Sequence, residues 1–82
     1  YLHFEVPQLA PLVGSFDTQL LEEFFKAFTV HSGITLHIRV LYGRNTHHII
    51  EGIFKAFGRA LREAVSIDAE NPGIPSTKGL ID

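Results

Sequence analysis

Apolar and polar side chains alternate along the first six residues of the chain. One face of this six-residue segment carries Tyr1, His3 and Glu5, and the other face carries Leu2, Phe4 and Val6. A period of two predicts a half-buried strand, which Pro7 ends. Residues 7–15 contain two prolines and one glycine, and we expect them to form a loop that lies against the body of the protein.

The next stretch changes to a helical period. Asp17 is a suitable N-cap, and Gly33 is a natural residue just past the C-terminal end. The apolar stripe between them consists of Leu20, Leu21, Phe24, Phe25 and Phe28. This helix carries no cluster of chemically active side chains, so a structural role is predicted for it.

The strongest strand pattern runs from Ile34 to Tyr42, where alternate residues are β-branched, leucine or aromatic. Gly43 ends the pattern. Asn45 then provides the N-cap of a second helix, which is predicted to continue to about Val65.

The predicted order is therefore strand, helix, strand, helix, which is an α+β half-domain. Two strands are too few for a stable sheet, so at least one more strand must come from elsewhere, most simply from residues before Tyr1. Residues 66–82 contain two prolines and two glycines without any period. They predict an irregular C-terminal tail behind a folded unit of residues 1–65.

The second helix has a chemical side and an apolar side. At about 100° per residue, His47, His48 and Glu51 share one narrow face, which Lys55 extends by a turn. The opposite side consists of Ile50, Ile53, Phe54, Phe57, Ala60, Leu61 and Ala64. That wide apolar side must pack on something.

Composition narrows the class of protein. The chain has 82 residues, which allow one small domain, and 45% of them are hydrophobic, which suggests burial against additional protein. A net charge of −2 argues against a nucleic-acid or anionic-membrane partner. There is no cysteine and no apolar run long enough to span a bilayer. A non-membrane, soluble protein of a reducing compartment fits these features.

Two imidazoles and a carboxylate suit Mn, Fe, Zn, Ni or Co. His47 and Glu51 could share one ion, as could His48 and Glu51. The two histidines are about 100° apart, so two ions, or one ion and one substrate contact, suit this geometry better than one shared ion. The plain alternative is a pair of surface histidines at the start of a helix.

The tail holds a second constellation at Ser76-Thr77-Lys78-Gly79. Its hydroxyls, ammonium group and flexible backbone can wrap a phosphate, although the glycine spacing of a Walker loop is absent. A solvated chain end is the alternative for such a segment.

Two motifs in this sequence resemble one enzyme family closely. Residues 36–51 read L-H-I-R-V-L-Y-G-R-N-T-H-H-I-I-E, and residues 74–79 read I-P-S-T-K-G. Together, G-x-N-x-H-H-x-x-E and P-S-T-K-G resemble the imidazoleglycerol-phosphate dehydratases. The segment from Phe16 to Phe28 also fits that family, so the resemblance covers nearly the whole chain.

The resemblance implies a hydro-lyase that converts imidazole glycerol phosphate to imidazole acetol phosphate in histidine biosynthesis. It implies two similar halves, each a mixed sheet with two helices on one face (ribosomal S5 domain 2-like). It further implies a homo-oligomeric shell of 24 subunits, two Mn²⁺ ions per complete site, and a cytoplasmic location, or a plastid one in a plant.

Roles for individual residues follow from the same resemblance. The implied metal ligands are His47, His48 and Glu51. The implied catalytic residues are Glu51 and Lys55, and the implied substrate and phosphate contacts are Lys55, Ser76 and Lys78.

This chain departs from the family in length. Family chains are more than twice as long, and the match is to their C-terminal half, so a first histidine motif and one strand of this half are missing. We expect either a piece of a longer enzyme or a separated half. The main alternative to an enzyme is a non-catalytic half that acts only as a structural or assembly module, and an α+β nucleic-acid-binding module is a weaker one.

Overall fold

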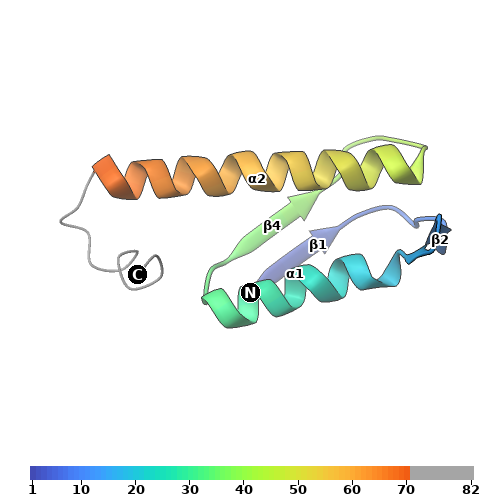
Figure 1. Cartoon of the computed structure of the whole chain (residues 1–82), viewed down its shortest axis with the longest axis horizontal. Helices are drawn as coiled ribbons and strands as arrows, with labels where there is room; N and C mark the ends of the chain where they lie inside the picture. Colours follow the sequence, from blue (N-terminus) through green and yellow to red (C-terminus); the bar gives the residue numbers. More distant parts are fainter. Residues whose placement is uncertain (71–82) are drawn as a thin grey trace.

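The computed structural model describes residues 1–70, with side chains to residue 67. It is a small α+β unit. The elements in chain order are β1 (Leu2–Glu5), β2 (Leu12–Val13), β3 (Phe16–Asp17), α1 (Gln19–Ser32), β4 (Leu36–Arg39) and α2 (Thr46–Glu70) (Figure 1). The predicted strand–helix–strand–helix order is confirmed, with one additional small hairpin.

Strands β1 and β4 pair in parallel, with Leu2 opposite Leu36 and Glu5 opposite Arg39. The predicted strand from Ile34 to Tyr42 is shortened to four residues. Its partner sets this limit, because Pro7 has no backbone N–H with which to continue the ladder beyond β1. Past the paired segment the chain turns outward, and Tyr42 is 90% exposed.

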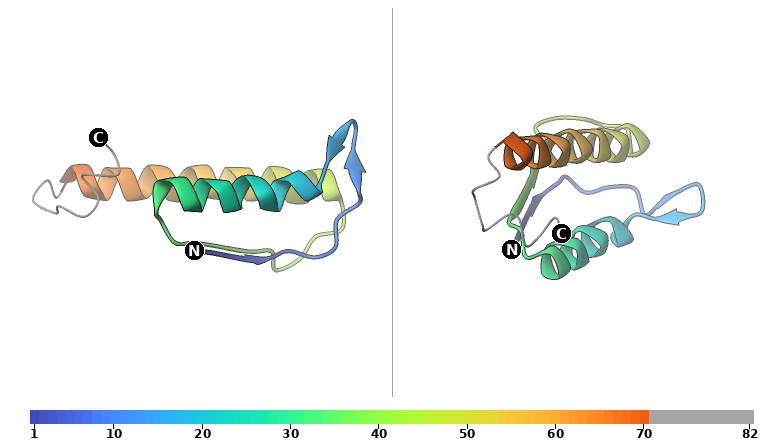
Figure 2. Two further views of the ribbon diagram at one scale, coloured as in Figure 1. Left: turned by 90° about the horizontal axis from the view of Figure 1, so that it is seen from below. Right: turned by 60° about the vertical axis from the view of Figure 1, so that its left-hand side comes forward.

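Both helices lie on one face of this two-stranded sheet, as the left view of Figure 2 shows. The predicted α+β half-domain with two helices on one face is therefore confirmed. Its core lies between the helices and the inner face of the strands. The buried apolar residues are Leu21, Phe25, Ile38, Ile49 and Ile53.

The C-terminal end of α1 is as predicted from the sequence, whereas its N-cap is shifted by one residue. Gly33 adopts the left-handed conformation at φ 74°, and its N–H donates to the Thr29 carbonyl at 2.9 Å. At the other end the N-cap position is Thr18, not Asp17 as predicted. Asp17 still serves the helix start, because its Oδ1 accepts the Gln19 N–H at 2.9 Å. The Thr18 hydroxyl donates instead to the Ala10 carbonyl at 2.6 Å.

Residues 7–15 are not entirely a loop. The antiparallel pair of β2 and β3 forms a hairpin, with Gly14 at φ 61° in its turn. Gly14-Ser15, with the apolar Val13 and Phe16 on either side, is a two-residue hairpin signal that the prediction overlooked.

Helix α2 is longer than predicted and projects beyond the sheet. It continues to Glu70 rather than to about Val65, so the predicted irregular tail is wrong for residues 66–70. The segment 66–70 contains neither proline nor glycine, and nothing in it stops a helix. A helix of 25 residues is about 37 Å long, whereas a four-residue strand spans about 13 Å.

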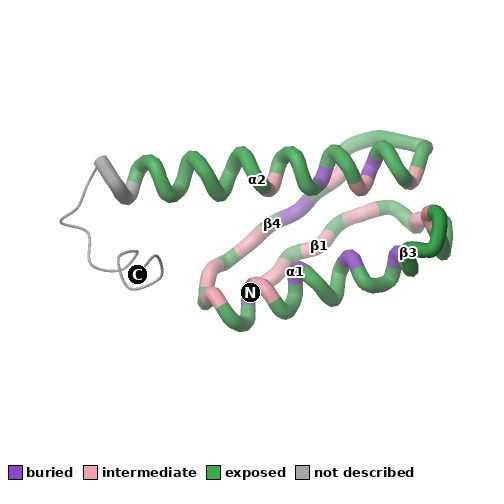
Figure 3. The backbone as a smooth tube through the Cα atoms, in the orientation of Figure 1, coloured by how far each residue is buried: buried purple, intermediate pink, exposed green. Residues whose placement is uncertain are grey.

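The projecting part of α2 therefore has no sheet beneath it. Residues 58–67 are all exposed, as Figure 3 shows, including Leu61 and Val65. The sequence predicted a packed apolar face here, and the described chain supplies no partner for it. Within residues 1–70 neither helix has both the length and the apolar character needed to cross a membrane.

Replacement of Gly43 by alanine should destabilise the fold. Gly43 has φ 147°, and a Cβ there would lie 2.9 Å from Cγ1 of the buried Ile49. We expect the free energy of unfolding to fall by about 1–3 kcal/mol, measured by urea denaturation. Gly58→Ala is the matched control, because nothing lies near its added Cβ and alanine favours the helix. Equal effects of the two substitutions would contradict this account of Gly43.

Candidate functional site at the start of α2

The first turn of α2 is held by a side-chain cap, as the sequence predicted. Asn45 Oδ1 accepts the His48 N–H at 3.0 Å, and the Asn45 carbonyl accepts the Ile49 N–H at 2.9 Å. The loop before α1 is tied to the same turn, because the Ala10 N–H donates to the Thr46 hydroxyl at 3.0 Å. These bonds fix the place from which the candidate ligands project.

Three of the predicted site residues form a row along α2. Glu51 Oε2 lies 3.6 Å from His47 Nε2, and Glu51 Oε1 lies 3.7 Å from Lys55 Nζ. The carboxylate is thus shared between an imidazole and an ammonium group, each one turn away. The three side chains are 53–71% exposed, so the row is accessible to a ligand.

The two histidines open onto different hollows. His47 lines a hollow of about 610 Å³, together with Glu51 and Lys55. His48 lines another of about 470 Å³, between α2 and β4. The ring centroids of the two histidines are 6.0 Å apart. This divergence matches the expectation that one ion shared by both histidines is awkward.

The hollow beside His47 has an apolar floor. Its remaining lining residues are Val13, Phe16, Ile50 and Phe54. Val13 and Phe16 come from the β2–β3 hairpin, so the sequence analysis missed them as site residues. The Gly-Ser turn was the signal that could have placed them there.

The donor set fits a divalent transition metal but does not complete a site. Imidazole nitrogens and a carboxylate are suitable ligands for manganese and its neighbours. Within the described part of the chain, no three histidine, aspartate or glutamate side chains converge on one point. His47, His48 and Glu51 therefore offer partial coordination that further donors must complete.

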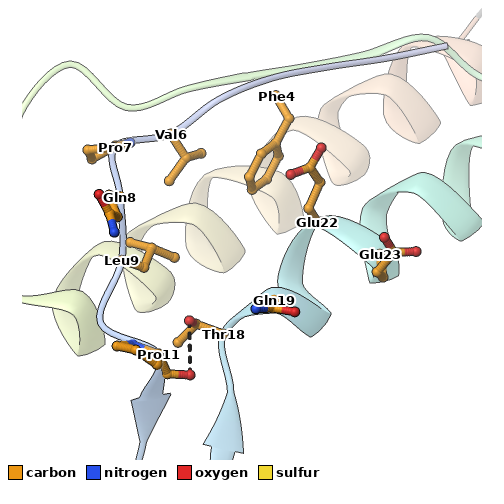
Figure 4. A pocket seen from close by; sticks show the side chains of 10 residues that line it. All are labelled: Phe4, Val6, Pro7, Gln8, Leu9, Pro11, Thr18, Gln19, Glu22 and Glu23. Atoms are coloured by element: carbon orange, nitrogen blue, oxygen red, sulfur yellow. Dashed lines mark hydrogen bonds between the residues drawn. The ribbon is translucent and has the colours of Figure 1, made fainter.

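The remaining predicted site residues, Ser76 and Lys78, lie outside the described residues. A separate hollow of about 530 Å³ lies where the chain after β1 meets the start of α1 (Figure 4). Glu22, Glu23 and Thr18 are among its lining residues, and the Thr18 hydroxyl donates to the Pro11 carbonyl at 3.2 Å. None of the predicted site residues in the described part of the chain lines this hollow.

Comparison with known proteins gives one consistent result. The family model described as imidazoleglycerol-phosphate dehydratase matches residues 1–61. The chain belongs to the imidazoleglycerol-phosphate dehydratase family. The dehydratase of Desulforamulus reducens is 60% identical over 99% of this chain, and that of Symbiobacterium thermophilum is 58% identical over the same share.

The solved dehydratase of Staphylococcus aureus agrees in structure. It is 52% identical, with a TM-score of 0.72 over 74% of this chain. The chain spans only 41% and 39% of the two sequence relatives, and 36% of the S. aureus chain. The resemblance found in the sequence motifs is thereby confirmed for the family and for the half-domain fold.

Replacement of Asn45 by alanine should fray the first turn of α2, which carries His47 and His48. Loss of the cap should cost about 1 kcal/mol. Hydrogen exchange of the His48 and Ile49 amides, followed by NMR, should accelerate, while exchange in α1 stays unchanged. Asn45→Asp keeps the acceptor oxygen and is the matched control. Unchanged exchange in Asn45→Ala would show that the cap does not hold this turn.

Proposed function

We propose that this chain supplies one metal-binding row and a phosphate-binding segment to an imidazoleglycerol-phosphate dehydratase. The reaction would be the removal of water from imidazole glycerol phosphate to give imidazole acetol phosphate, in histidine biosynthesis. The observation that carries the proposal is the row of His47, Glu51 and Lys55 on the outer side of α2, in a chain about 60% identical to a dehydratase.

His47, His48 and Glu51 are the residues that would hold manganese. A bound ion would act as a Lewis acid on the imidazole of the substrate. Because the two histidines open onto different hollows, they suit two ions, each completed by donors from outside the described residues. This support is geometric and chemical, and it leaves the identity of the metal as a proposal.

Lys55 would position Glu51. Its ammonium group lies 3.7 Å from Glu51 Oε1, while the other carboxylate oxygen faces His47. An exposed pair of this kind contributes little to stability, so its value is in orienting the carboxylate. Glu51 would then present one oxygen to a ligand, and the Lys55 charge would favour an anionic substrate beside it.

Ser76 and Lys78 would anchor the phosphate group of the substrate. A hydroxyl and an ammonium group form charge-assisted hydrogen bonds to phosphate oxygens. Binding energy from the phosphate can then be used to orient the carbon that reacts. Support for this role comes from the P-S-T-K-G motif at residues 75–79.

We further propose that the chain works within a homo-oligomer. Phe24 and Phe54 are 50% and 40% exposed, and their ring centroids are 5.8 Å apart. Leu20 adds to the exposed apolar side chains of α1. Such a surface is typical of a face that other protein covers. It also favours the alternative role, a module that assembles without turning over substrate.

Substitution of single residues of the row should lower metal binding without unfolding α2. We predict that His47→Ala and Glu51→Gln each lower the Mn²⁺ bound by the chain at least about tenfold, because each loses a ligand. Electron paramagnetic resonance of Mn²⁺ measures the binding, and circular dichroism checks the helix. His31→Ala, in the last turn of α1, is the matched control. Wild-type Mn²⁺ binding in Glu51→Gln would remove this residue from the ligand set.

A chimera tests the proposed activity. This chain should replace the matching part of the S. aureus dehydratase and preserve turnover of imidazole glycerol phosphate. In the chimera, Lys78→Ala should raise KM roughly tenfold or more and lower kcat less, because one charge-assisted bond contributes about 1.5–3 kcal/mol of binding. Metal content should stay unchanged in this variant.

Two outcomes would count against these roles. A chimera that assembles normally but lacks turnover supports the assembly module instead of the enzyme. If the chimera is active and Lys78→Ala either leaves KM unchanged or removes manganese, the phosphate role of Lys78 is wrong while the dehydratase activity stands.

A further inference from the structure

The sheet has one face that the helices do not cover. Leu2, Phe4 and Leu36 point toward the core, so the alternating positions point away from it. Both helices lie on the core side (Figure 2). The open face carries exposed side chains only, namely Tyr1, His3, Glu5, His37 and Arg39.

Two histidines face each other on this surface. His3 on β1 is the register partner of His37 on β4, so their Cα atoms lie directly across the parallel pair. Their ring centroids are 5.4 Å apart, and the ring planes are tilted by 33°. The backbone ladder therefore holds two imidazoles side by side, independently of any contact between the rings.

This spacing fits two ligands of one ion. A Zn–N bond of about 2.0–2.1 Å places each ring centroid roughly 3.2 Å from the metal, and a tetrahedral angle then separates the centroids by roughly 5.2 Å. The observed separation is 5.4 Å. We propose that His3 and His37 form a two-histidine binding site for a borderline divalent cation such as Zn²⁺, Cu²⁺ or Ni²⁺.

The groups next to His3 and His37 determine which further ligands the ion has. Glu5 is the nearest carboxylate along β1, but its Oε2 lies 2.7 Å from Arg39 Nε and is held by that ion pair. The ring of Tyr1 approaches His37 edge-on, at 5.9 Å between centroids. The ion thus takes two imidazoles from the protein and water at its other positions. A site without a carboxylate selects zinc, copper or nickel over manganese, unlike the row that contains Glu51.

A Zn²⁺ titration of the chain, followed through the imidazole NMR signals of each histidine, tests this site. The signals of His3 and His37 should change together over one range of Zn²⁺ concentration. His3→Gln should weaken Zn²⁺ binding at His37 at least about tenfold, and His37→Gln should do the same at His3, because each ring holds the ion at high effective concentration for the other. His31→Gln is the matched control and should leave both signals unaffected.

Independent behaviour of the two rings would overturn the proposal. The proposal is wrong if the NMR signals of His3 and His37 change over different ranges of Zn²⁺ concentration. It is also wrong if only the signals of His47 and His48 change. The titration of the unsubstituted chain decides the matter by itself if a variant fails to fold. Loss of the site would leave the manganese row on α2 and the proposed dehydratase role untouched, since neither uses the open face of the sheet.

Discussion

The packing of Phe25 against α2 is the contact on which the rest of this structure depends. Phe25 is fully buried on α1, and its ring centroid lies 5.3 Å from that of Phe54 and 5.2 Å from that of Phe57. Four-residue strands can hold only one end of a 25-residue helix. The aromatic contact therefore sets the rotation of α2 about its own axis, and with it the direction in which Glu51 points.

This arrangement separates stability from chemistry on a single helix. Ile49 and Ile53 are buried on one side of α2, while His47, Glu51 and Lys55 are more than half exposed on another. Exposed ion pairs contribute at most about 1 kcal/mol, so the row does not hold the helix in place. The side chains of the row can therefore give up their contacts with one another and bind a ligand instead, without loss of the fold.

The sequence allowed the periods of β1, β4 and the two helices, the Gly33 end of α1 and the Asn45 cap of α2 to be predicted, because each depends on local sequence pattern and backbone chemistry. It did not allow the strand length to be predicted, since β4 ends at Arg39, opposite the last residue of β1, Glu5, shortly before Pro7. The position of Val13 and Phe16 beside His47 also depends on how the hairpin docks. The row was predictable from its helical spacing, whereas the separate hollows of His47 and His48 required the fold.

The exposed aromatic surface and the incomplete site are neighbours, and this proximity links assembly to chemistry. Phe54 belongs both to the exposed pair with Phe24 and to the floor of the hollow that Glu51 and Lys55 line. Protein that covers Phe54 therefore also excludes water beside Glu51. Charges interact more strongly as the effective dielectric constant falls, so such a covering surface would strengthen the attraction between Glu51 and the proposed cation. If the row holds a metal ion as proposed, burial of this apolar face and completion of the metal site would be one event.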